Sequence, residues 1–194
     1  MKQMLFSFSG WVLILLLAHD SSCQQKSQTE NSLIPLAVGH TWIYRDSIFE
    51  NGKLKETQMD TVKIISREMF EGTPAYHFSN GKELMLRHDT LYEMTAQRTG
   101  IKFPTPIFIA TTSEADFNYL LGGDVMMKRK AVKLKQCAFG GETSYECWKV
   151  TDQCNAEMIF ASGIGEVRSV TGDCSGQHND YSTHTLVKFI PSLK

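Results

Sequence analysis

Histidine and carboxylate side chains gather near the C-terminus of the 194-residue chain, and they are its first candidates for chemistry. Asp173, His178, Asp180 and His184 fall within one short polar segment. Carboxylate oxygens and imidazole nitrogens are metal ligands, so a metal site is one interpretation of this segment. Their spacing matches no established metal motif, and polar loops commonly collect such residues. We therefore expect no metal here.

Cys174 lies within Gly172–Gly176, which has the G-x-C-x-G form of a nucleophile elbow. Such an elbow exposes its nucleophile because a strand turns sharply into a helix. Residues 177–182 are polar and lack helical periodicity, so a glycine-rich loop that holds a disulfide is favoured. No nucleophile, base and orienting group can be named together. We expect no catalytic residue and no cofactor, and a hydrolase is the least favoured function.

Basic residues form one cluster in the chain. It consists of Lys128, Arg129, Lys130, Lys133 and Lys135. In a membrane-tethered domain such a cluster could contact anionic headgroups. A solvated strand face, or lysines that protect an edge strand, is the favoured interpretation. The formal net charge of −1 makes nucleic acid a poor candidate partner.

Four of the five cysteines lie in the C-terminal third of the chain. Cys137 and Cys147 are placed symmetrically about Gly140–Glu142, and Cys154 and Cys174 are placed symmetrically about Ile164. Residues arranged in this way face each other across a hairpin. We therefore predict the disulfides Cys137–Cys147 and Cys154–Cys174. Zinc is disfavoured because no C-x-x-C pair is present, and reduced thiols in an anaerobe are the other alternative.

The N-terminus carries a short apolar segment that sets the location of the protein. Lys2 precedes Leu5–Ala18, which is shorter than the roughly 20 apolar residues that a membrane span needs. The following Ser21, Ser22 and Cys23 resemble the lipidation signal of bacterial lipoproteins, although Asp20 stands where that family usually has an apolar residue. The resemblance implies that Cys23 is lipidated and becomes the new N-terminus. An uncleaved anchor and an ordinary signal peptide are the alternatives.

The signal divides the chain into three parts. We expect a lipoprotein signal peptide at 1–22, a lipidated cysteine and flexible tether at 23–32, and one β-rich domain at 33–194. Gln24 follows the cysteine, which in the enteric pattern resembles sorting to the outer membrane. The predicted location is therefore the cell envelope, with the protein held by its lipid, and the outer membrane is favoured.

Turn residues at short intervals predict an all-β domain. Asn51-Gly52 and Asn80-Gly81 are strong hairpin signals, and the N-terminal half reads as an antiparallel meander. Gly100–Ile107 contains two prolines and is predicted as a loop or edge segment. Ser113–Leu121 could form a short helix. About ten strands with at most one or two helices favour an antiparallel β-sandwich or barrel.

Two sites in the predicted domain carry a second resemblance. Pro35, Leu36, Gly39, Trp42 and Tyr44 near the start, with Gly163–Val167 near the end, resemble a domain common in uncharacterised Bacteroidota lipoproteins. That family has no settled activity. The resemblance therefore implies a single β domain and no particular chemistry.

The function expected from these features is that of a non-enzymatic cell-envelope lipoprotein. Its barrel-like domain would bind an apolar or lipid-like ligand, because closed sheets of about eight strands or more can enclose one small ligand. The alternative is a solid-core β-sandwich that serves as an interaction module of an outer-membrane assembly. Its partners would be the membrane, through the N-terminal lipid, and either a small ligand or an envelope protein. A cavity inside the domain distinguishes the two.

Overall fold

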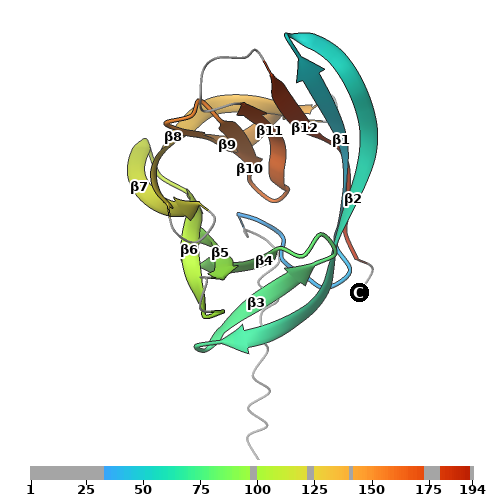
Figure 1. Cartoon of the computed structure of the whole chain (residues 1–194). Helices are drawn as coiled ribbons and strands as arrows, with labels where there is room; N and C mark the ends of the chain where they lie inside the picture. The colour runs from blue at the N-terminus through green and yellow to red at the C-terminus, as the bar shows by residue number, and fades with distance from the viewer. Residues whose placement is uncertain (1–32, 97–99, 122–124, 140–141, 173–179, 193–194) are drawn as a thin grey trace, which may run out of the picture.

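The computed structural model describes residues 33–96, 100–121, 125–139, 142–172 and 180–192. These residues form twelve antiparallel strands and no helix (Figure 1). No helix among them is long and apolar enough to cross a membrane. The strands are β1 (Thr41–Glu50), β2 (Lys53–Phe70), β3 (Thr73–Phe78), β4 (Glu83–Arg87), β5 (Thr90–Ala96), β6 (Lys102–Ile109), β7 (Glu114–Leu121), β8 (Val125–Phe139), β9 (Glu142–Asp152), β10 (Glu157–Ala161), β11 (Gly165–Gly172) and β12 (Tyr181–Ile190).

All strands belong to one sheet that curls into a nearly closed barrel, which confirms the predicted all-β class. Strands β1 to β6 form one meander and β7 to β12 form a second. The first and last strands of the sequence join the two meanders, because β1 pairs with β12. Strands β6 and β7 are the two ends of the sheet, and no β-ladder joins them among the described residues. The barrel therefore has one seam, between β6 and β7.

The barrel interior is filled largely by side chains that alternate along the strands. In β1, Trp42 and Tyr44 are buried, and in β2, Val62 and Ile64 are buried while their neighbours are exposed. This period of two is the expected pattern for a sheet with one face in the core. The indole of Trp42 donates a hydrogen bond of 2.7 Å to the carbonyl of Ile164, so its one polar atom is satisfied.

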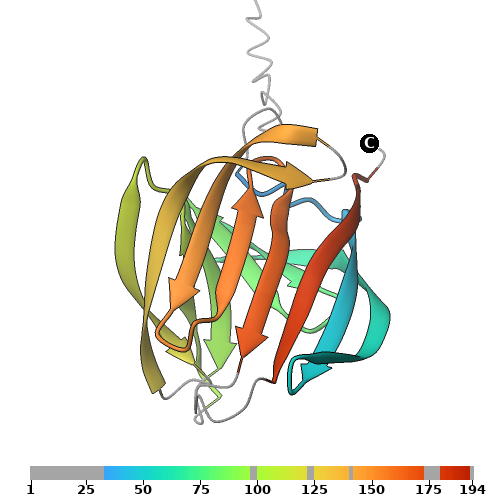
Figure 2. The ribbon, with the colours of Figure 1, turned by 90° about the horizontal axis from the view of Figure 1, so that it is seen from above.

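The segment that precedes β1 closes one end of the barrel. Residues 33–40 cross this end beside the β10–β11 turn (Figure 2). The carbonyl of Leu33 accepts a hydrogen bond of 3.1 Å from the amide of Gly163, and Ile34 is 4% exposed. A Cβ at Gly165, where φ is +99°, would lie 3.4 Å from the side chain of Ile34. Glycine at this position allows the close approach and the left-handed backbone conformation.

Two predicted segments differ in the structure. The predicted helix at Ser113–Leu121 is wrong, because residues 114–121 form strand β7. Ala115, Phe117 and Tyr119 are partly or fully buried and alternate with exposed Glu114, Asp116 and Asn118, which is a strand period. The proline segment is strand β6 at one end of the sheet, as its edge interpretation predicts. Proline is tolerated there because an end strand needs fewer ladder hydrogen bonds.

The disulfide Cys137–Cys147 is present in the structure, with Cα atoms 6.0 Å apart. The two residues are not direct partners in the ladder, because register shifts place Cys147 opposite Leu134 and Cys137 opposite Tyr145. Figure 2 shows the end of the β8–β9 hairpin bending across the ends of β10 and β11. The amide of Ser162 donates 2.8 Å to the carbonyl of Glu146. The disulfide thus fixes a hairpin that covers the closed end of the barrel.

Candidate functional site

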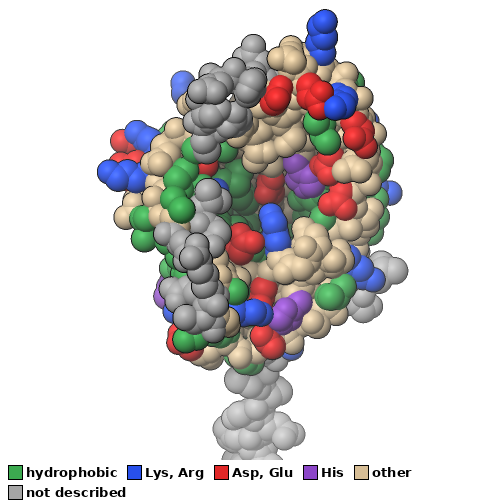
Figure 3. All heavy atoms as spheres, in the orientation of Figure 1, with side chains coloured by type: hydrophobic (Ala, Val, Ile, Leu, Met, Phe, Trp, Pro, Cys, Tyr) green, Lys and Arg blue, Asp and Glu red, His purple; other side chains and the backbone are tan. Residues whose placement is uncertain are grey.

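An open pocket lies inside the barrel. Figure 3 shows a hollow with hydrophobic side chains in its depth and charged side chains around it. The hollow faces the viewer of Figure 3, which has the orientation of Figure 1, and Figure 2 shows residues 33–40 on the side of the barrel away from that viewer. The lining residues are Ile34, Trp42, Tyr44, Val62, Phe78, Asn80, Lys82, Leu84, Leu91, Ile107, Phe160, Gly165, Glu166 and His184.

The depth of the pocket is apolar and small. The pocket and its open mouth hold about 590 Å³ of empty space, but the volume open to the centre of a water molecule is about 80 Å³. One enclosed water needs roughly 10–15 Å³ of such volume, so the pocket has room for a few waters or for a small apolar group. The rest of any larger ligand would have to lie in the mouth.

His184 is a pocket-lining residue that is held by two neighbours. Its Nδ1 atom is hydrogen bonded to a carboxylate oxygen of Asp46, and its ring is stacked on Tyr44 with centroids 3.8 Å apart. Strands β1 and β12 bring these residues together, because Asp46 is the ladder partner of His184. The carboxylate fixes the orientation of the imidazole, so the ring presents a defined face and edge to the pocket.

Tyr44 connects this contact to β11, which lies two strands away from β1 in the sheet. Its hydroxyl donates a hydrogen bond of 3.0 Å to the backbone carbonyl of Glu166, and Glu166 also lines the pocket. Burial raises the pKa of Tyr44 well above its usual value of 10.0, and the nearby charges of Glu166 and Asp60 raise it further. Tyr44 is therefore a neutral donor throughout the physiological pH range.

This raised pKa predicts a stability change at alkaline pH. Above about pH 10 the unfolded chain loses the Tyr44 proton while the folded protein keeps it, so this stabilising contribution is present below about pH 10 and declines above it. The expected decline is about 1.4 kcal/mol per pH unit. We expect Tyr44→Phe to lose about 1 kcal/mol near neutral pH, through the missing hydrogen bond. That deficit should shrink or vanish near pH 11.

Urea unfolding of wild type and Tyr44→Phe at about pH 8 and about pH 11 measures this change. The other tyrosines and lysines titrate in both proteins and cancel in the difference. An equal stability difference at the two pH values would exclude the raised pKa.

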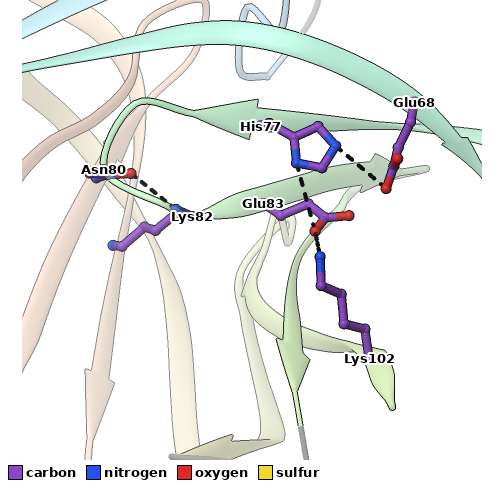
Figure 4. A network of polar contacts seen from close by, with 6 residues as sticks. All are labelled: Glu68, His77, Asn80, Lys82, Glu83 and Lys102. Atoms are coloured by element: carbon purple, nitrogen blue, oxygen red, sulfur yellow. Dashed lines mark hydrogen bonds and ion pairs between the residues drawn. The ribbon is translucent and has the colours of Figure 1, made fainter. Parts of the chain in front are cut away.

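A second polar cluster joins β2, β3, β4 and β6 (Figure 4). His77 lies between two carboxylates, with Nε2 3.4 Å from Glu68 and Nδ1 3.8 Å from Glu83. Lys102 is hydrogen bonded to Glu83, which is only 5% exposed, and this contact raises the pKa of Lys102. Three possible metal ligands lie within 4.8 Å of one another, but the Lys102 ammonium already neutralises the buried carboxylate. The cluster is best explained as an ion-pair network that stabilises buried Glu83.

The structure describes two of the four residues that the sequence placed together as possible metal ligands, and it gives these two different partners. Of the four proposed metal ligands, His184 lines the pocket and Asp180 accepts a hydrogen bond of 2.8 Å from the amide of Asn51. Asp173 and His178 lie outside the described residues, as does Cys174. The pairing of Cys154 with Cys174 therefore stays a prediction, as does lipidation of Cys23, which also lies outside them.

The basic cluster of β8 is divided between the two faces of the strand. Lys130 and Lys133 form ion pairs with Glu114 and Glu146. Arg129 instead packs on the ring of Tyr119, with its guanidinium carbon 3.5 Å from the ring centroid. A single basic surface over the whole cluster is therefore not formed, and contact of the remaining lysines with headgroups stays a hypothesis.

Asp46, Lys82 and Glu166 were not identified from the sequence as site residues. Lys82 directly follows the hairpin signal Asn80-Gly81, where polar residues are expected, and Asp46 lies within strand β1, five positions before Asn51. Glu166 is the second residue of β11, just after a glycine-rich turn, and nothing in its sequence surroundings indicates a site. One sequence signal points to this site. Tyr44 lies in an aromatic strand that should be buried, and a buried tyrosine needs a partner for its hydroxyl.

The fold and the pocket define this protein as a nearly closed β-barrel with one open end. No protein-family model matches the chain, and no curated protein matches it. One solved structure has a similar backbone: "a putative lipoprotein" from Parabacteroides distasonis, with 10% sequence identity, a TM-score of 0.44, and coverage of 82% of this chain and 99% of that one. Similarity at this level transfers no function.

Proposed function

We propose that this protein is a non-enzymatic, lipid-anchored protein of the cell envelope whose barrel binds a small amphipathic or apolar ligand. The observation that carries this proposal is the pocket, which combines buried apolar walls with a polar mouth at one end of the barrel. Ligand sites commonly have this character, with mostly apolar walls and a few placed polar groups. The size of the deep part limits its occupant to a ring or the end of a chain, so a whole lipid would extend into the mouth.

The polar mouth favours an amphipathic ligand over a purely apolar one. Asn80 and Lys82 approach it from the β3–β4 turn, and Figure 4 shows the Lys82 side chain pointing away from Glu83. Glu166 and His184 also line the pocket, from β11 and β12. An ammonium group, a carboxylate and the oriented imidazole could hydrogen bond to the polar end group of a ligand. Leu84, Leu91 and other apolar residues would contact the apolar part of that ligand.

A lipid anchor would orient the pocket away from the membrane. Cys23 precedes Leu33 by ten positions, which is a reach of at most about 35 Å. Leu33 lies at the closed end of the barrel, because its carbonyl is bonded to Gly163 in the β10–β11 turn. A tether that leaves from this end favours an open end that faces the aqueous compartment. The ligand would then arrive from solution rather than directly from the bilayer.

Binding is favoured over hydrolysis because of the surroundings of His184. Asp46 orients the ring as it would a general base. Among the described residues, however, no hydroxyl or thiol is hydrogen bonded to the second ring nitrogen. The arrangement fits recognition of a polar group.

We expect Leu84→Trp to block the pocket. Leu84 is partly buried on the pocket wall, so an indole placed there would occupy the space that the ligand needs. The full chain in lipid nanodiscs is exposed to a medium-chain alcohol that carries a photoreactive diazirine, and labelled residues are mapped by peptide mass spectrometry. Wild type should be labelled on pocket residues, and Leu84→Trp should lose about tenfold or more of that label.

Ile65→Trp is the matched control, because Ile65 lies on β2 outside the pocket and is 58% exposed. Its pocket label should equal that of wild type. Labelling spread over the outer surface, and unchanged in Leu84→Trp, would contradict the proposal. That outcome would favour the interaction module, in which the barrel serves as a solid scaffold.

A further inference from the structure

Two buried polar atoms lack a hydrogen-bond partner among the described residues. They are the hydroxyl of Thr105, a residue that is 3% exposed, and the Nε atom of Arg129. Buried polar atoms are nearly always hydrogen bonded, because one that is left unpaired has lost its contacts with water and gained none in return. Two such atoms close to a pocket therefore indicate groups that a bound molecule could satisfy.

Both residues lie beside the seam of the barrel and next to the pocket. Arg129 extends from β8 to β6, where its Nη1 atom donates a hydrogen bond of 3.4 Å to the carbonyl of Ile107, a pocket-lining residue. Thr105 lies on β6 opposite Glu93, which is two residues after the pocket-lining Leu91 on β5. Alternate residues of a strand share one face, so Thr105 faces the barrel interior together with the pocket wall.

The charge of Arg129 is the second argument. The side chain is partly buried and packs on Tyr119, while the neighbouring Lys130 forms an ion pair. No carboxylate of the described residues forms a salt bridge with Arg129. Asp152, its ladder partner, instead accepts a hydrogen bond of 3.2 Å from the hydroxyl of Tyr119. The guanidinium therefore still has N–H groups that can donate to an anion. Its planar, forked arrangement of donors matches a carboxylate or a phosphate.

We infer that Arg129 and Thr105 bind the anionic end group of the ligand, a carboxylate or a phosphate monoester. This inference rests on the proposed function, because it assigns the ligand's charged end to the seam and its apolar part to the pocket. Glu93 faces the same side but forms neither a salt bridge with Arg129 nor a hydrogen bond with the Thr105 hydroxyl. Its charge would oppose an anion, so its removal should strengthen binding.

Matched diazirine probes test the inference. A medium-chain carboxylic acid, the corresponding alkyl phosphate and the corresponding alcohol are applied to the full chain in lipid nanodiscs, and pocket labelling is followed against probe concentration. Arg129→Gln should weaken labelling by the acid and the phosphate about tenfold and leave the alcohol unchanged. The preferred anionic head is identified by comparing the acid with the phosphate on wild type.

Further variants separate ligand binding from a purely structural role. Lys128→Gln, on the exposed face of the same strand, should change nothing. Glu93→Gln should strengthen labelling by the anionic probes. Thr105→Val should weaken their labelling and yet leave the unliganded protein at least as stable, since it removes an unpaired hydroxyl.

The outcomes distinguish the two proposals. Pocket labelling by all three probes that does not change in Arg129→Gln overturns the anion site and leaves the proposed function standing. If labelling by all three probes falls equally in Arg129→Gln, Arg129 only stabilises the packing at the seam. That result also overturns the anion site. No pocket labelling by any probe overturns the proposed function itself.

Discussion

Replacing Cys23 by alanine should release the protein from the membrane or leave it as an unprocessed precursor. The expectation rests on the short apolar segment before Cys23 and on the small residues Ser21 and Ser22 that precede it. Acyl chains stabilise membrane attachment by about 0.8 kcal/mol per buried methylene, so an anchor of several chains is effectively permanent. Loss of Cys23 removes the whole anchor, and we expect the membrane-bound fraction of mature protein to fall by at least about tenfold.

Metabolic labelling with an alkyne fatty acid measures this directly. Wild type should carry the label and Cys23→Ala should not. Ser22→Gly is the control, because it keeps a small residue before the cysteine and should retain the label. Equal labelling of wild type and Cys23→Ala, or a mature protein that begins at another residue, would refute the anchor and with it the predicted location.

Local signals predicted the turns of the first meander because their cause is local. Asn51 and Gly52 have φ of 50° and 72°, and few residues other than Asn and Gly adopt such values easily. The signal thus fixes a hairpin from two residues without knowledge of the rest of the chain. The helix predicted at Ser113–Leu121 is wrong because polar residues that can cap a helix also occur before a strand, whereas the period of two, which the burial of Phe117 and Tyr119 follows, is specific to a strand.

The pocket could not be predicted because its contacts are long-range. Asp46 and His184 are 138 positions apart, and Tyr44 and Glu166 are 122 positions apart. Only the pairing of β1 with β12, and of β12 with β11, brings them together. Neither hairpin signals nor composition indicates which strands outside a hairpin will pair. The sequence therefore gives the residue types, but it does not predict that these residues lie together in the folded protein.

The disulfide shows how a correct pair can follow from an approximate argument. Symmetry about a turn suggested that Cys137 and Cys147 face each other, but two register shifts displace them along the ladder. The bond still forms, because neighbours on a twisted hairpin remain within the usual Cα separation. β-Bulges cannot be read from spacing. Here they leave Cys147 two positions away from Tyr145, the ladder partner of Cys137.

Phe108 should be among the most costly residues to truncate. It is fully buried on β6 and stacks on Phe160 of β10 with centroids 4.3 Å apart and planes at 7°. Its ring also meets Trp148 of β9 edge-on at 5.7 Å. Since no β-ladder joins β6 to β7 among the described residues, these contacts couple the first meander to the second across the barrel. Side-chain packing here replaces the missing ladder.

We expect Phe108→Ala to lower the free energy of unfolding by about 3–5 kcal/mol, through lost burial and the cavity that remains. Domains of this kind have only about 5–15 kcal/mol in total, so the variant should be close to unfolding at 37 °C. Ile101→Ala is the control, because Ile101 precedes β6 and is 66% exposed, and it should change stability by less than about 0.5 kcal/mol. Urea unfolding of the three proteins gives the midpoints and m-values. A loss below about 1 kcal/mol in Phe108→Ala, with m unchanged, would show that the seam is held by other contacts, and Arg129 with its bond to Ile107 would then be the first to examine.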